Sequence, residues 1–224
     1  TYLLMLGKIE KKKGNFRETM KLFEKANQYE NSESMYEIGK MHYKLYKVSG
    51  FEVDKEKSIE FYKKSIERGN YKAMFKYGIM LKDDKSREPN SIEEGVKLIK
   101  MSADKGYIKS CYYYSMMLEN GEINEINKEE SKRYLKYASM KGHINSLYKY
   151  SIELLNSSKD PNTKKESIFL LKKASDKCHF ESMYQYGIML LKGDGIKINK
   201  EEAEKYLRIS AYNGNSDVMK SYCE

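Results

Sequence analysis

The chain has 224 residues, of which 42 are lysine or arginine and 33 are aspartate or glutamate, so its formal net charge at pH 7 is +9. It holds 21 tyrosines but only two prolines and no tryptophan, a composition that suits amphipathic helices joined by short turns. No apolar run reaches the roughly 18 residues that a membrane span needs. Three scattered cysteines are too few for a disulfide framework, so we expect a reducing, cytoplasmic environment.

Residues 1–30 are predicted to form a helix pair of their own. Gly7, Thr19, Phe23 and Ala26 have the spacing of a tetratricopeptide unit, in which two short helices pack against each other. We therefore expect this N-terminal pair to precede the main repeat array.

From residue 31 onward one short pattern recurs: a turn residue, a small residue four positions later, a tyrosine after four more, and then another small residue. The turn residues are Gly69, Gly106, Gly142, Cys178 and Gly214, at steps of 37, 36, 36 and 36 residues. A fixed period in this range predicts stacked helical repeats, each covering the apolar face of its neighbour. We expect about five repeats over residues 31–224, with the last one incomplete.

Each repeat is best described by numbering positions from its turn residue, which is position 0. Position −15 holds residues that cap helix N-termini, namely Asp54, Ser91, Asn127, Thr163 and Asn199. Glutamate follows three residues after the last four of them, which is the pattern of a capping box. The turn residue then ends this helix, and a second helix carries small residues at +4 and +9. The sequence thus predicts an all-α fold of antiparallel helix pairs.

Residues 187–214 carry a more specific pattern. Gly187, Gly193, Gly195, Ala203 and the Ser210–Ala211 pair have the order and spacing of the Sel-1-like repeat, which this segment resembles. The similarity extends over about residues 31–224, although serine often replaces alanine and tryptophan is absent. This resemblance implies a right-handed α-solenoid that acts as a scaffold or adaptor.

Candidate catalytic, cofactor and metal sites are not found. No histidine is spaced from a second histidine or a cysteine pair as metal ligands are. His143 and His179 share position +1, where we expect a helix start that faces solvent. We therefore predict no catalytic residues, no cofactor and no metal.

Positions +6 and +10 are apolar although they lie away from the +4, +8 and +12 stripe, which we expect to form the core. In a tetratricopeptide superhelix the matching positions line a concave groove, so we predict partner binding there, to a helical or extended segment. The alternative is that successive inner helices bury this face. We call these residues the inner row: Tyr36, Phe75, Ile79, Tyr112, Met116, Tyr148, Ile152, Tyr184 and Ile188.

Position −6 carries one positive charge in every repeat. These residues, the outer ladder, are Lys63, Lys100, Lys136, Lys172 and Arg208. A ladder of this kind either keeps the surface soluble or attracts an acidic protein surface. The absence of aromatic residues beside it, and the acidic residues on its flanks, argue against nucleic acid.

The sequence therefore predicts a non-catalytic scaffold or adaptor that binds protein partners in its concave groove and supports a larger complex. A second hypothesis is a regulatory repeat arm of a multidomain enzyme such as a protein kinase. A third, nucleic-acid binding by the basic outer face, has less support.

Overall fold

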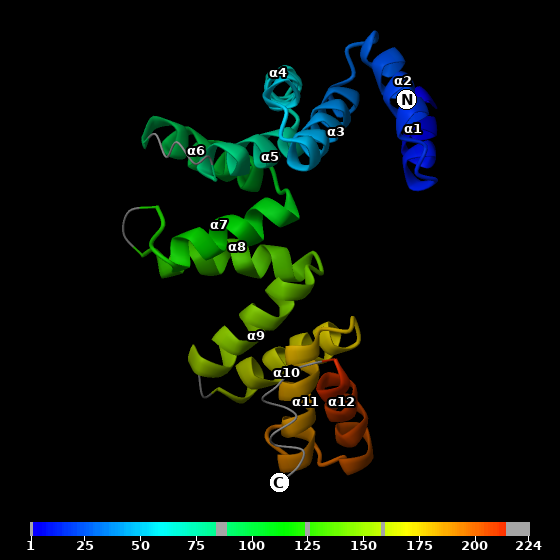
Figure 1. Ribbon diagram of the computed structural model, residues 1–224. Helices are drawn as coiled ribbons and strands as arrows, with labels where there is room; N and C mark the ends of the chain where they lie inside the picture. The colour runs from blue at the N-terminus through cyan, green and yellow to red at the C-terminus, as the bar shows by residue number, and fades with distance from the viewer. Residues whose placement is uncertain (1, 84–88, 124–125, 158–159, 214–224) are drawn as a thin grey trace. The chain divides into compact units, whose positions relative to one another are not determined.

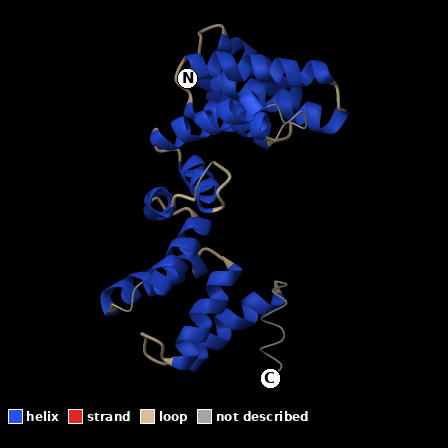
Figure 2. Cartoon of the chain, turned by 90° about the vertical axis from the view of Figure 1, so that its left-hand side faces the viewer, coloured by secondary structure: helices blue, strands red, loops and turns tan. Residues whose placement is uncertain are grey.

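The computed structural model describes residues 2–83, 89–123, 126–157 and 160–213, and these ranges contain twelve α-helices and no strand (Figures 1 and 2). The predicted all-α fold class is confirmed. The helices are α1 (Tyr2–Lys12), α2 (Phe16–Asn27), α3 (Ser32–Ser49), α4 (Glu52–Glu67), α5 (Tyr71–Lys82), α6 (Pro89–Asp104), α7 (Ile108–Glu119), α8 (Lys128–Met140), α9 (Ile144–Ser157), α10 (Pro161–Ser175), α11 (Phe180–Lys192) and α12 (Lys200–Tyr212).

The chain divides into two compact units, with the boundary inside α7 between Ser110 and Cys111. The N-terminal unit contains α1 to α6 and the first turn of α7, and the C-terminal unit contains the rest. In the N-terminal unit α3 packs chiefly on α4 and α5 on α6, while in the C-terminal unit α9 packs on α10 and α11 on α12 (Figure 1). The first helix of each pair, the inner helix, follows a turn residue, and the second, the outer helix, ends at the next one.

The apolar cores join neighbouring helix pairs. Phe23 of α2 is fully buried and belongs to one cluster with Ile38 and Met41 of α3, so the N-terminal pair packs on the pair that follows it. In the C-terminal unit Leu171 of α10 and Leu190 of α11 share another cluster. Each pair thus covers the apolar face of its neighbour, as the repeat period predicts.

The turn column has the left-handed backbone that the glycines predict. Gly69, Gly106 and Gly142 have φ angles of 76°, 76° and 81°. Two non-glycine residues in the described ranges also have a positive φ: Cys178 of this column, at 61°, and Glu30, which takes the equivalent position before α3, at 52°. The last recurrence of the pattern, from Gly214 onward, lies outside the described residues.

The two helices of a pair lie close together where position +9 of the inner helix faces position −11 of the outer one. At Gly78 and Gly95 a Cβ atom added to either glycine would lie 2.7 Å from the carbonyl oxygen of the other. At Gly187 the nearest atom to an added Cβ is instead in the side chain of Leu207, at 2.8 Å. Small residues at these positions therefore set the distance between the helices.

Buried serines form hydrogen bonds between the two helices of every pair from α3–α4 to α11–α12. At position −11, Ser58, Ser131 and Ser167 each donate a hydroxyl hydrogen bond of 2.8 Å to the +9 carbonyl of the inner helix. At position −4, serine hydroxyls donate to the +2 carbonyl, as Ser102 does to Tyr71 at 2.6 Å. Because −11 meets +9 and −4 meets +2, the two helices run antiparallel. These bonds explain why serine replaces alanine without leaving a buried polar group unsatisfied.

The predicted N-caps are confirmed at two positions and wrong at three. Asn127 and Asn199 accept hydrogen bonds from the backbone N–H groups of the glutamates three residues later. The helices at Asp54, Ser91 and Thr163 begin earlier than predicted. Asp54 pairs instead with His42 at 2.9 Å, and Thr163 donates its N–H to Asp160, the cap of α10.

The strained turn at Cys178 yields a first prediction. An L-residue in the left-handed region costs about 1–2 kcal/mol, a strain that glycine does not carry. Cys178→Gly should therefore raise the free energy of unfolding by about 1 kcal/mol, measured by urea denaturation. The reverse change at Gly142, Gly142→Cys, is the matched control and should lower it. An unchanged or reduced stability for Cys178→Gly would refute this assignment of strain.

Candidate protein-interaction surfaces

The inner row is buried at its N-terminal end. Only 4% of Tyr36 and 6% of Phe75 is exposed. The ring of Tyr36 lies 6.2 Å from that of Tyr62, and Phe75 meets Tyr107 edge to face at 5.6 Å. The expectation that these two rings face a partner is corrected, because aromatic residues of the same unit cover them. Ile79 is half-buried.

The inner row is half-buried throughout the C-terminal unit. Its members there are Tyr112, Met116, Tyr148, Ile152, Tyr184 and Ile188. The ring of Tyr112 lies 4.7 Å from that of His143, and the ring of Tyr148 lies 4.9 Å from that of His179. The +6 tyrosine of one repeat thus packs against the +1 residue of the next, and part of its side chain stays exposed.

His143 and His179 are not the solvent-facing residues that the sequence predicts. Both are half-buried and cap the helices that follow them. Nδ1 of each accepts a 3.3 Å hydrogen bond from the backbone N–H three residues later, at Ser146 and Ser182 respectively. Burial lowers the pKa of the His179 imidazole, against the opposing charge of Glu181. The two asparagines in the same column, Asn31 and Asn70, show that +1 is a capping position.

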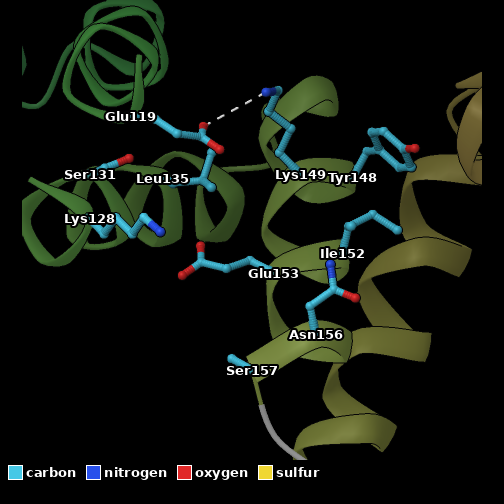
Figure 3. Close-up of a pocket in the computed structure, with 10 residues that line it drawn as sticks. All are labelled: Glu119, Lys128, Ser131, Leu135, Tyr148, Lys149, Ile152, Glu153, Asn156 and Ser157. Atoms are coloured by element: carbon cyan, nitrogen blue, oxygen red, sulfur yellow. Dashed lines mark ion pairs between the residues drawn. The ribbon is translucent and has the colours of Figure 1, made fainter. Parts of the chain in front are cut away.

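A surface hollow adjoins the inner row in the C-terminal unit (Figure 3). It has a volume of about 500 Å³ and lies between α8 and α9, with Glu119 of α7 at its edge. Leu135, Tyr148 and Ile152 give it apolar walls, and Lys149 and Glu153 extend from α9 toward α7 and α8. Lys149 pairs with Glu119 at 3.8 Å. This hollow suits an apolar side chain flanked by polar or charged groups.

The outer ladder is not one uniform basic surface. Lys63, Lys136, Lys172 and Arg208 are exposed, whereas Lys100 is half-buried. Nζ of Lys63 lies 5.8 Å from the ring centroid of Tyr77, and Lys172 pairs with Glu202 of the next capping box at 3.8 Å. At least two charges of the outer ladder, those of Lys63 and Lys172, are therefore in contact with other residues of the fold.

The described residues hold no group of three or more histidine, cysteine, aspartate or glutamate side chains arranged to bind a metal. Of the cysteines in the described ranges, Cys111 is buried and Cys178 is exposed on a turn. None of the described helices combines the length and the hydropathy that crossing a membrane requires.

Comparison with protein families matches the Sel1 repeat over residues 32–70, 72–107, 108–143 and 180–215. The chain belongs to the Sel1 repeat family. The family match leaves out residues 144–179, which contain α9 and α10. In this segment Ser167 donates a hydrogen bond to the carbonyl of Ser151, which is equivalent to the bond from Ser131 to Ser115 in a matched repeat. Among curated proteins, none matches the sequence significantly.

Solved structures show the same fold. A Sel1 repeat protein from Oxalobacter formigenes superimposes with a TM-score of 0.79 at 21% identity, over 98% of this chain and 64% of the other. A protective antigen of uropathogenic Escherichia coli with an SLR fold gives a TM-score of 0.76 at 20% identity, over 96% of this chain and 46% of the other. The fold is therefore the predicted α-solenoid. The chain spans less than two thirds of either relative.

The cap formed by His179 predicts a pH-dependent stability. Folding lowers the pKa of His179 below its ordinary 6.5, so the folded state binds fewer protons than the unfolded state. The neutral imidazole therefore contributes to the free energy of unfolding above pH 6.5, and this stabilisation is lost as the pH falls below that value. His179→Asn keeps a capping oxygen that does not titrate. Between about pH 7 and pH 5, thermal melts should show a larger loss of stability for the wild type than for His179→Asn. Parallel pH profiles would contradict this role.

Proposed function

We propose that this Sel1 repeat protein is a non-catalytic adaptor that binds a helical or extended segment of a partner protein on the inner face of its C-terminal unit. Helical repeat solenoids commonly present such extended binding surfaces. The observation that carries the proposal is the half-buried aromatic and aliphatic row on α7, α9 and α11, which continues into the hollow beside Tyr148 and Ile152.

The chemistry of this face favours an amphipathic segment. Apolar side chains at +6 and +10 lie about one helical turn apart, which matches the spacing of apolar residues on a partner helix. Each repeat would then bury part of one ring and one aliphatic side chain, at about 25 cal/mol per Å² of apolar surface. The pair formed by Lys149 and Glu119 at the edge offers a charge of each sign to polar groups of the segment.

The other functions have weaker support. The outer ladder carries nearby carboxylates, such as Glu202 beside Lys172, which oppose a polyanionic backbone. A regulatory arm of a multidomain enzyme stays a prediction, which the full-length reading frame tests. A cytoplasmic location is likewise part of the proposal.

A site-specific photo-crosslinking experiment tests the proposed surface. Benzoylphenylalanine replaces Tyr148 or Tyr184 on the inner face, and Phe169, which is 63% exposed on the outer helix α10, provides the matched aromatic control. Irradiation in a lysate of the source cells, followed by mass spectrometry, should give the same crosslinked protein from both inner positions and none from position 169. Melting curves confirm that each substituted chain is folded.

Crosslinks that form from position 169 and not from the inner positions would place the binding surface on the outer helices and refute the proposal. Crosslinks of equal yield at all three positions would show non-specific contact and would also refute it.

A further inference from the structure

Three lysines gather on the inner helices of the N-terminal unit, where the inner row is buried. Lys40 lies on α3, Lys76 on α5 and Lys109 in the first turn of α7, so three successive inner helices contribute one positive charge each. We call Lys40, Lys76 and Lys109 the inner lysine cluster. None of its three members belongs to the outer ladder or to the inner row.

Aromatic rings form the floor of this cluster. Nζ of Lys40 lies 5.8 Å from the ring centroid of Tyr36, and Nζ of Lys76 lies 5.9 Å from that of Phe75. Phe75 in turn packs on Tyr107, which directly precedes α7. Lys40 and Lys76 are half-buried on these rings, and Lys109 is exposed. Water therefore screens the first two charges less than it screens an ordinary surface lysine.

The nearest acidic residues already have other partners. Glu33 accepts hydrogen bonds from Lys8 at 3.1 Å and from Lys72 at 2.7 Å, and Glu37 accepts one from Lys11 at 2.5 Å. Among the described residues no carboxylate forms an ion pair with a member of the inner lysine cluster. The three positive charges of the cluster are therefore not neutralised by an ion pair within the described part of the chain.

The electrostatics of the cluster agree with this geometry. Burial lowers the pKa of Lys76, and the positive charges of Lys40 and Lys109 lower it further. Burial also lowers the pKa of Lys40, where the opposing effect of Glu37 is countered by Lys11 and Lys109. A bound anion would relieve this repulsion, because an opposite charge favours the protonated lysines.

We propose that the inner lysine cluster binds an acidic segment of a partner protein, through two or more aspartate or glutamate side chains close together in its sequence. The cluster spans three adjacent helices, so a short peptide lying across them can reach all three ammonium groups. Single-stranded nucleic acids bind largely by stacking of bases on aromatic side chains, and Tyr36 and Phe75 are too buried to stack on bases. An acidic peptide therefore fits this surface better than a nucleic acid.

Fluorescence anisotropy with a short labelled peptide rich in aspartate and glutamate tests the proposal on the whole chain. The same peptide with asparagine and glutamine in their place is the probe control. The test variant carries Lys40→Gln, Lys76→Gln and Lys109→Gln, and the matched control carries Lys63→Gln, Lys136→Gln and Lys172→Gln, which remove the same charge from the outer ladder.

The wild type and the outer-ladder variant should bind the acidic peptide, and the inner-cluster variant should bind it about tenfold or more weakly, as expected for lost charge-assisted contacts. The inner-cluster variant should also melt at an equal or higher temperature without ligand, since like-charge repulsion is removed. No binding by the wild type, equal binding by the inner-cluster variant, or an equal loss in the outer-ladder variant would each overturn the proposal. Preference for a single-stranded oligonucleotide over the peptide would overturn it too.

Discussion

The close approach of two helix backbones in each pair is the contact on which the rest of the structure depends. At Gly78 and Gly95 no side chain separates the helices, and in other repeats serine fits the same positions and adds a hydroxyl hydrogen bond, as Ser131 does. Helices this close leave the larger residues at neighbouring positions to fill the space between repeats.

The same pairing determines which parts of the inner face are available. Where the +1 residue of the next repeat is aromatic, as Tyr107 is, its ring packs on the +6 ring of the preceding repeat, and that ring, Phe75, is buried in the core. Where it is histidine, as at His143 and His179, the imidazole caps a helix and packs against the tyrosine, which stays half-buried. The two units therefore offer different surfaces: half-buried apolar rings in one, and lysines above buried rings in the other.

Much of the fold could be predicted from the sequence, because the period, the turn column and the small residues act locally. The left-handed turn at Gly69 follows from its residue type, whereas that at Glu30 does not, because glutamate carries no signal for positive φ. Burial of Phe75 depends on a ring from the next repeat, and the inner lysine cluster joins positions +10, +7 and +3 of successive repeats. Neither feature can be predicted from one position of the repeat taken alone, because both depend on how neighbouring helices pack against each other.

The most direct test of the close helix approach is the sign of the stability change in Gly78→Ala. Helix propensity alone predicts that alanine stabilises α5 by about 1 kcal/mol. The structure predicts the opposite, a loss of about 1–3 kcal/mol in the free energy of unfolding by urea denaturation, because the new Cβ would meet the carbonyl oxygen of Gly95 at 2.7 Å. Ser151→Ala, at the same +9 position but without an added Cβ, is the control and should cost less. A Gly78→Ala protein as stable as the wild type, or more stable, would contradict the account.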